Sequence, residues 1–450
     1  MSSSSFPPYF PNSASINSSG QLEVGGYNLV DLASRFGTPL YVLDEQTIRE
    51  TAQSFKSALD KYYPNNLPIF ASKSLCLQAV FSILQQEGFG LDVVSSGELY
   101  TAQSINFPAE KIYLHGNNKS LEELSMAADY KGSNGGSKVI LDNFNDLELL
   151  KKIGKPVDAL LRLTPGVECH THEYIKTGHL DSKFGFDLDQ IDDAIKQIKS
   201  ISNINLIGLH AHIGSQIFET SPYQDAARIL LEHFVKLKEK YGYEFTELNV
   251  GGGFGIHYTE ADDPPAIDDV IGKLTSTVKS LLKEFSLGEP KLIIEPGRSM
   301  VGRAGVTLYT LGAKKEVPGV RNYISTDGGM ADNPRPITYQ AKYSACIANK
   351  ANQEPDTLYT VAGRYCESGD VLIKDINLPA STESGDLLAV FGTGAYNYSM
   401  SSNYNRVPRP SMVLVHNGEA EIILQRENLE DLLRNDVLPS RLAKRREAVH

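Results

Sequence analysis

Short apolar runs alternate with longer stretches of helical spacing through the middle of the chain. Eight such runs recur, and each of the first seven is followed by a segment that suits a helix. Strands that alternate with helices favour a parallel sheet, and eight of them in this length predict a (β/α)8 TIM-type barrel. The predicted strands lie at 67–73, 90–95, 112–116, 138–143, 158–166, 204–214, 245–255 and 291–298.

Polar, charged or glycine residues stand at the end of each apolar run. In a parallel barrel the carboxyl ends of all strands open onto one face, where active sites lie. We therefore expect these side chains to be neighbours around one mouth. They are Lys73, Asp92, His115, Asn143, Arg162, His212, residues 251–253 and residues 295–298.

The pattern of apolar and polar residues changes near residue 300, where short apolar runs separated by turn residues predict an all-β module. These strands are expected at 306–312, 323–326, 343–347, 358–361, 386–391 and 411–415. The fold class is therefore α/β plus all-β, a barrel followed by a C-terminal β-sandwich or barrel-like domain. The predicted division is a disordered leader at 1–20, strands that join the β domain at 21–44, the barrel at 45–300, and the β domain with a terminal helix at 301–450.

Composition narrows the partners of the chain. Its 450 residues carry a formal charge of -12 and a pI near 5.4, which argues against nucleic acid or an anionic membrane as partner. The four cysteines have no paired spacing, so neither a disulfide framework nor a structural zinc site is indicated. The first twenty residues lack Lys, Arg and an apolar core, which predicts neither a signal peptide nor a transit peptide. We expect a cytoplasmic protein.

Lys73 is the candidate nucleophile, since a lysine amine at a strand end condenses with an aldehyde when it is held neutral. The glycine run 251–255 lets backbone amides approach a phosphate, and it falls with residues 297–298 after the last two strands, where barrels often bind phosphate. A tight turn is the alternative for these glycines. Glu295 would hold a pyridine nitrogen protonated, or else pair with Arg298 or Arg162.

Two further groups leave alternatives open. His210 and His212 alternate along a strand and project to the same side, where they would bind a metal, with more ligands at 169–172, or stack on a flat cofactor. We favour stacking and expect no metal. Cys366 is either a buried core thiol or an acid in catalysis.

In combination, these residues resemble the fold type III pyridoxal-phosphate decarboxylases over residues 21–426. The motifs that carry the resemblance are Phe70-Ala71-Ser72-Lys73, residues 115–120, Thr177-Gly178 with residues 181–185, His212-Ile213-Gly214-Ser215, residues 251–255, residues 295–298, Asp327-Gly328-Gly329-Met330, Cys366-Glu367-Ser368 and residues 401–405. One departure is Thr164, where many relatives carry Asn.

The resemblance implies a cofactor, pyridoxal 5'-phosphate, joined to Lys73 as an imine. It implies that the cofactor contacts are Lys73, Asp92, His212, Ser215, Gly252, Gly253, Gly255, Glu295, Gly297, Arg298 and Tyr396. The implied substrate contacts are Arg298, Arg335, Tyr339, Glu367 and Tyr396. Cys366 is implied as the proton donor, on a loop that reaches the neighbouring subunit's site, which makes the unit a homodimer with two composite sites.

Substrate choice within this family follows from charge. Two arginines, Arg298 and Arg335, can bind a distal carboxylate, and Glu367 can bind the distal amine. This favours decarboxylation of meso-2,6-diaminopimelate to L-lysine. The alternatives are an ornithine or arginine decarboxylase of the same fold, a catalytically silent regulatory homologue, and a racemase, for which an arginine is expected opposite the pyridine nitrogen.

Overall fold

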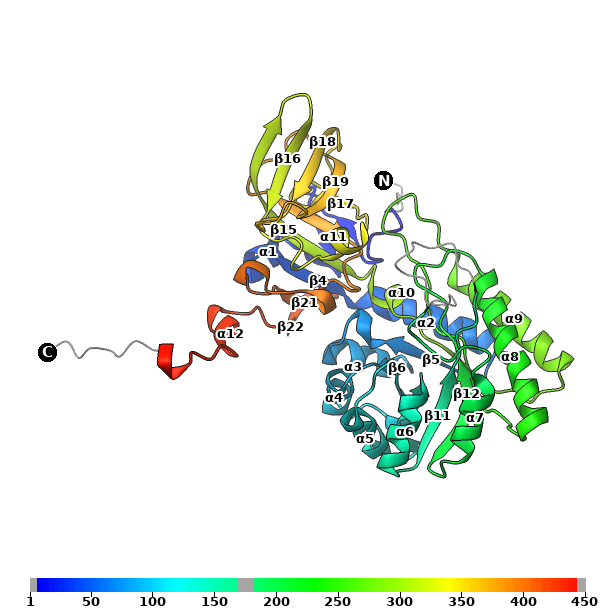
Figure 1. The fold of residues 1–450 in the computed structure, drawn as a ribbon. Helices are drawn as coiled ribbons and strands as arrows, with labels where there is room; N and C mark the ends of the chain where they lie inside the picture. Colours follow the sequence, from blue (N-terminus) through cyan, green and yellow to red (C-terminus); the bar gives the residue numbers. More distant parts are fainter. Residues whose placement is uncertain (1–5, 168–181, 443–450) are drawn as a thin grey trace.

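The computed structural model describes residues 6–167 and 182–442. Figure 1 shows two lobes, one built from a barrel and its helices and the other from β-strands. The residues 169–172 and the part of the predicted motifs at 177–181 lie outside the described residues.

Eight parallel strands close into a barrel, as the alternation predicted. Their apolar residues are buried on both faces, which is why these strands appear in the sequence as continuous apolar runs. The strands are β5 Asn66–Ala71, β6 Gly90–Val93, β7 Ile112–Leu114, β10 Lys138–Leu141, β11 Val157–Arg162, β12 Ile204–His210, β13 Glu247–Asn249 and β14 Lys291–Ile294.

Helices surround the barrel, and their apolar faces pack on the strands. The helix α2 Glu45–Tyr62 precedes the first strand and packs against α9, which completes the ring. The others are α3 Gln78–Gln86, α4 Ser96–Ser104, α5 Leu121–Asp129, α6 Phe144–Ile153, α7 Ile191–Lys199, α8 Ser221–Tyr241 and α9 Ile267–Glu284. Inside the barrel, a second apolar cluster is built from Leu67, Ile69, Tyr113, Ile140, Leu160 and Ile293.

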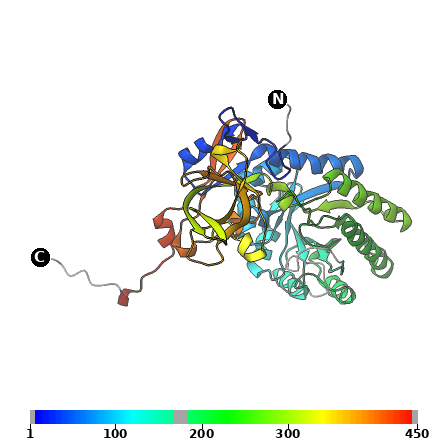
Figure 2. The same ribbon diagram turned by 90° about the horizontal axis from the view of Figure 1, so that it is seen from above.

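The second lobe is a nine-stranded sheet in which β4 from the N-terminal segment pairs with β15 and β21. Figure 2 shows this lobe beside the barrel. Its strands are β4 Leu40–Asp44, β15 Gly305–Val317, β16 Arg321–Thr326, β17 Ala345–Ile347, β18 Thr357–Ala362, β19 Val371–Leu378, β20 Leu387–Phe391, β21 Ser411–His416 and β22 Glu419–Leu424. The pairing of β4 is what the sequence predicted, whereas β19 and β22 were not predicted.

The region expected to contain only strands and turns also holds a helix, α1 Leu29–Phe36, after β2 Leu22–Val24 and β3 Tyr27–Asn28. Asn28 caps this helix by accepting a hydrogen bond from the amide of Val30. Leu29 and Leu32 are three residues apart and both are buried, which is the spacing of one helix face. This spacing favours a helix over the strand expected here.

The leader was predicted to be disordered, and for residues 6–20 this is wrong. The Phe10 ring lies 3.9 Å from the Phe391 ring, centroid to centroid. Asn12 donates its backbone amide to Thr47 and its side chain to Glu50. Aromatic side chains supply apolar surface that the Ser-rich composition concealed, and burying one contributes roughly 1.5–3 kcal/mol. Residues 15–16 form a short strand, β1 Ser15–Ile16.

A helix was predicted to end the β domain, but residues 427–442 are mostly not helical. Only α12 Leu429–Leu433 and a 3-10 turn, η7 Ser440–Leu442, form there. Pro439 interrupts the periodic pattern, because the residue before a proline is disfavoured in the helical conformation. Figure 1 shows α12 projecting from the β lobe.

None of the helices in the described residues is long and apolar enough to cross a membrane.

Candidate active site

The lysine of the first barrel strand faces a cavity at the carboxyl ends of the strands. Lys73 lies in the 3-10 turn η1 Ser72–Ser74, directly after β5. An inner cavity of about 40 Å³ and an outer one of about 510 Å³ both include Lys73 and Tyr396 in their walls, so the two form one hollow around the lysine. The inner wall is completed by Ala71, His212, Ser215, Gly253, Phe254, Glu295, Gly297 and Arg298.

The structure therefore brings together most of the predicted cofactor residues, from the ends of four barrel strands and, with Tyr396, from the β lobe. Gly252 and Gly255 belong to the same glycine run, and Asp92 lies behind Glu295 beside His115. Four predicted substrate or catalytic residues do not line the cavity of their own chain: Arg335 is buried, and Tyr339, Cys366 and Glu367 are exposed. A larger hollow of about 1060 Å³ lies between β17 and β19 in the β lobe and contains none of the predicted site residues.

Glu295 is held by three side chains that the sequence did not assign to it. Asn249 donates to Oε1 at 2.8 Å, and the Nε2 atoms of His115 and His210 lie 3.1 and 3.2 Å from its two oxygens. These partners come from β13, the end of β7, and β12, and in the described residues no ion pair joins Glu295 to Arg298 or Arg162.

Electrostatics keeps Glu295 ionised. Burial would raise the pKa of this carboxyl, but His115 and His210 outweigh it and hold the pKa well below its usual range. Burial would lower the pKa of His115, but Asp92 and Glu295 outweigh burial and raise this pKa above its usual value. Burial lowers the pKa of His210 to about 4, which leaves it a neutral donor.

His115, His210 and Glu295 are also the group in the described residues whose ligand atoms lie close enough to hold a metal ion, within 4.8 Å of one another. His212, the other half of the predicted histidine pair, is not in this group. It lines the inner cavity instead, and its Nδ1 accepts a hydrogen bond from the amide of Gly252 at 3.2 Å. Burial and the nearby Lys73 lower the pKa of His212 well below its usual range, so a neutral ring faces the cavity.

The pH dependence of stability tests this assignment of charge. The unfolded chain binds a proton on His210 below about pH 6.5, whereas the folded chain does so only near pH 4. The free energy of unfolding therefore falls as pH falls through this window, and His210→Gln is expected to show a shallower fall. Urea unfolding at about pH 7 and about pH 5 measures this. If the free energy of unfolding falls equally between the two pH values in the wild-type protein and in His210→Gln, His210 is not a neutral buried group.

The glycine run makes close backbone approaches that a larger residue would block. A Cβ on Gly252 would lie 2.0 Å from the carbonyl oxygen of Glu295, and one on Gly253 would lie 2.6 Å from that of Gly214. Gly253 has a φ of +107°, which L side chains rarely adopt. The run leaves backbone at the cavity wall, beside the start of the short helix α10 Arg298–Val301.

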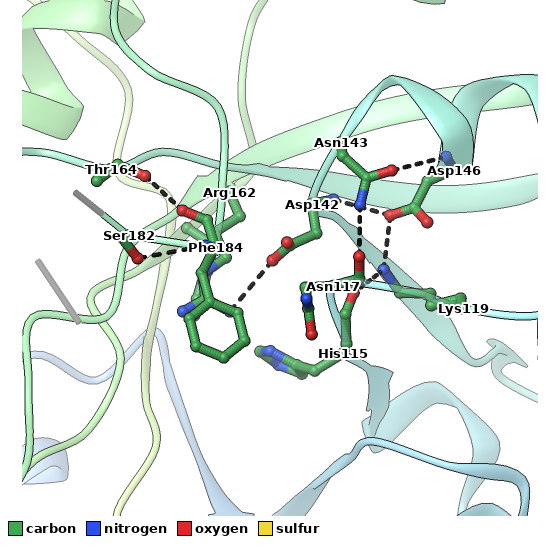
Figure 3. A network of polar contacts seen from close by, with 12 residues as sticks. His115, Asn117, Lys119, Asp142, Asn143, Asp146, Arg162, Thr164, Ser182 and Phe184 are labelled. Carbon is green, nitrogen blue, oxygen red and sulfur yellow. Dashed lines mark hydrogen bonds and ion pairs between the residues drawn. The ribbon is translucent and has the colours of Figure 1, made fainter. Parts of the chain in front are cut away.

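A second polar network holds Arg162 at the rim (Figure 3). Its NH1 lies 3.2 Å from Asp142 Oδ1, and its guanidinium carbon lies 4.4 Å from the centre of the Phe184 ring. Thr164, the departure from the family pattern, donates its hydroxyl to the carbonyl of Phe184 at 2.6 Å. Thr164 thus ties β11 to the segment that carries Phe184.

Two more residues, Lys119 of the motif 115–120 and the strand-end residue Asn143, have structural contacts. Lys119 is buried and donates to Asp146 and to the carbonyl of Gly116, each at 2.7 Å. Asn143 caps α6 through the amide of Asp146 and donates to the carbonyl of Asn117 at 2.9 Å. These contacts join neighbouring loops at the mouth, and neither side chain lines the cavity.

The cavity suits pyridoxal phosphate on the evidence of its walls. It offers a lysine amine, an ionised carboxylate, a neutral imidazole face and glycine backbone for an anion. Arg298 Nε is buried without a hydrogen-bond partner among the described residues, as expected for a donor that awaits an anionic ligand.

Comparison with known proteins agrees with this geometry. Residues 45–302 match the family model described as "Pyridoxal-dependent decarboxylase, pyridoxal binding domain". The diaminopimelate decarboxylase of Synechocystis sp. is 51% identical, covering 96% of this chain and 93% of the relative, and that of Bacillus subtilis is 49% identical, covering 94% and 96%. The crystal structure of M. jannaschii diaminopimelate decarboxylase in co-complex with L-lysine has a TM-score of 0.88 at 33% identity, covering 96% and 99%.

The chain therefore belongs to the pyridoxal-dependent decarboxylase family. The high identity and near-complete coverage place it, within that family, among the diaminopimelate decarboxylases. The resemblance inferred from the sequence motifs is confirmed.

Proposed function

We propose that Lys73 carries the pyridoxal phosphate and that the residues around the inner cavity hold it while a bound amino acid loses carbon dioxide. The function of the chain is the decarboxylation of meso-2,6-diaminopimelate to L-lysine, the last step of lysine biosynthesis. The observation that supports these residue roles most directly is that Lys73, His212, Glu295 and Gly253 line one cavity.

Bound pyridoxal phosphate supplies an aldehyde that condenses with amines and a ring that accepts the electrons left when carbon dioxide departs. Glu295, kept ionised by its two histidines, would accept a hydrogen bond from a protonated ring nitrogen and stabilise that proton. His212 would present a neutral imidazole face to the ring. Ser215, Gly253 and the backbone at Gly297 and Arg298 would donate to the phosphate.

Lys73 would hold the aldehyde of the bound cofactor through Nζ, and this amine would give way to the amine of the substrate. Arg298 and Arg335 bind the distal carboxylate, with Tyr339 and Tyr396 beside it. Cys366 returns a proton to the reacting carbon, and Glu367 receives the distal amine. The last two roles depend on a second subunit.

We propose a homodimer in which the loop of Cys366 and Glu367 completes the partner's site. Two observations support it. Both side chains are exposed and lie outside the cavity of their own chain. The C-terminal segment that Arg406 joins to this region, through the carbonyl of Leu432, also exposes apolar side chains, since Leu429, Val437 and Leu438 are 69%, 88% and 67% exposed. We also propose a cytoplasmic location, which suits the free thiols of Cys76, Cys346 and Cys366.

The composite site is tested by mixing two inactive variants. Lys73→Ala and Cys366→Ala proteins, unfolded together and refolded as a mixture, are expected to recover about a quarter of wild-type activity, because half of the dimers carry one intact site of two. Each variant refolded alone is the control. If the mixture stays as inactive as the separate variants, Cys366 acts within its own chain.

Substrate choice is tested by measuring carbon dioxide released from meso-diaminopimelate, ornithine and arginine, each incubated with the protein and pyridoxal phosphate. We expect turnover of the first alone, because the two arginines need a distal carboxylate. Comparable release from ornithine would overturn the substrate assignment.

A further inference from the structure

Tyr258 lies between the two arginines that are proposed to bind the distal carboxylate. Arg298 NH1 donates to the Tyr258 hydroxyl at 2.6 Å. The guanidinium carbon of Arg335 lies 4.8 Å from the centre of the same ring, at a distance typical of a cation–π contact. Tyr258 follows the glycine run, is only 6% exposed and was not assigned a role from the sequence.

Each arginine has at least one further contact. Arg298 NH2 donates to Ser215 Oγ at 3.0 Å, and its guanidinium carbon lies 4.9 Å from the centre of the Tyr396 ring. Arg335 NH1 donates to the hydroxyl of Tyr343 at 2.7 Å. The Tyr343 ring meets Tyr258 edge-on, with the ring centres 5.3 Å apart. The two guanidinium groups are therefore fixed around a single aromatic residue.

Neither arginine has a carboxylate partner among the described residues, although both are buried, at 7% and 6% exposed. Two buried cations without a counterion are costly, and an anionic ligand relieves that cost. The positive charge of the two arginines also acts on Tyr258. Burial would raise the pKa of its phenol, but Arg298 and Arg335 outweigh burial and lower this pKa. The arrangement is poised for a carboxylate.

We propose that Tyr258 is a positioning residue that sets substrate specificity, by holding Arg298 and Arg335 in place as one binding unit for the distal carboxylate. The inference rests on the proposed function and adds to it. An amino acid without that carboxylate leaves both buried guanidinium groups without a counterion. The loss of binding free energy is larger when the two groups are held rigidly, because they cannot turn to other partners. Tyr258 thereby separates diamino dicarboxylic acids from basic amino acids with one carboxylate.

The test is Tyr258→Phe, which keeps the ring and removes the hydroxyl that Arg298 contacts. For meso-diaminopimelate we expect KM to rise about tenfold with kcat within about twofold of wild type, the pattern of lost binding rather than lost chemistry. Calorimetric titration of the holoenzyme with L-lysine and with cadaverine isolates the cause, because the two ligands differ only in the carboxylate. Affinity for L-lysine is expected to fall about tenfold and that for cadaverine to stay unchanged.

Two variants complete the design. Tyr343→Phe removes the hydroxyl that holds Arg335. It is expected to weaken the binding of L-lysine and to leave the binding of cadaverine unchanged. Tyr62→Phe is the control: it removes a surface phenol that donates to Asp268 at 2.8 Å, and the affinity for both ligands is expected to stay unchanged. Equal losses for L-lysine and cadaverine in Tyr258→Phe, or a fall in kcat with KM unchanged, would overturn the inference. Failure of the proposed function has a different signature, namely no carbon dioxide from meso-diaminopimelate with the wild-type protein.

Discussion

Lys73→Ala is expected to lower kcat for meso-diaminopimelate by at least about 10⁴-fold, the largest effect of any single substitution in this chain. The cavity around position 73 contains no second lysine in the described residues, so no other amine there replaces Nζ. Released carbon dioxide measures the rate. Borohydride reduction followed by peptide mapping is expected to fix the cofactor to Lys73 in the wild-type protein and to leave the variant unlabelled.

A small amine supplied in solution distinguishes chemistry from folding in this variant. Methylamine fits the space vacated by the side chain and is expected to restore a measurable part of the rate. Lys61→Ala is the matched control, because Lys61 pairs with Asp268 on the surface and is expected to leave the rate unchanged. Near-wild-type activity in Lys73→Ala would disprove the assignment of the nucleophile.

Glu295→Gln is expected to lower kcat by about 10²–10³-fold, the second largest effect. The amide keeps the shape of the carboxylate but cannot be ionised, so it no longer stabilises a proton on the ring nitrogen. It also turns an amide nitrogen toward His115 or His210, both of which lie at donor distance from the native oxygens. Steady-state rates measure the loss, and the absorbance of bound cofactor above 300 nm is expected to shift with the lost proton.

Glu247→Gln is the matched control for this buried charge. Glu247 stands at the start of β13, at the opposite end of the barrel, where Tyr113 donates to it at 3.0 Å. Its substitution is expected to lower the melting temperature while kcat stays within about twofold of wild type. A Glu295→Gln protein with full activity and an unchanged spectrum would mean that the carboxylate does not face the ring nitrogen.

Local sequence was enough to predict the elements with the strongest patterns. Buried parallel strands appear as apolar runs, so 204–214 and 291–298 marked β12 and β14 without any knowledge of the fold. Weaker patterns failed: the helix α1 was expected to be strand and turn, and the contact between Phe10 and Phe391 was hidden in a Ser-rich segment.

Predicted site residues were found by their place at strand ends and by their motifs. Lys73, His212 and Glu295 follow apolar runs, and a closed parallel barrel places such positions at one mouth. Asn249 and Tyr258 carried no such signal, because an asparagine inside a strand and a tyrosine after a turn are common in proteins of every function. Their roles depend on what lies across the cavity.

The sequence by itself determined the alternation of strands and helices in the barrel and the family, and it singled out Lys73 as the candidate nucleophile, because these depend on local periodicity and on short motifs. Only the tertiary structure decided which partners hold Glu295, how Arg298 and Arg335 meet at Tyr258, and that Cys366 is exposed outside the cavity of its own chain. Such contacts join residues far apart in the chain, and their distances are set by how the barrel closes and how the β lobe packs on it.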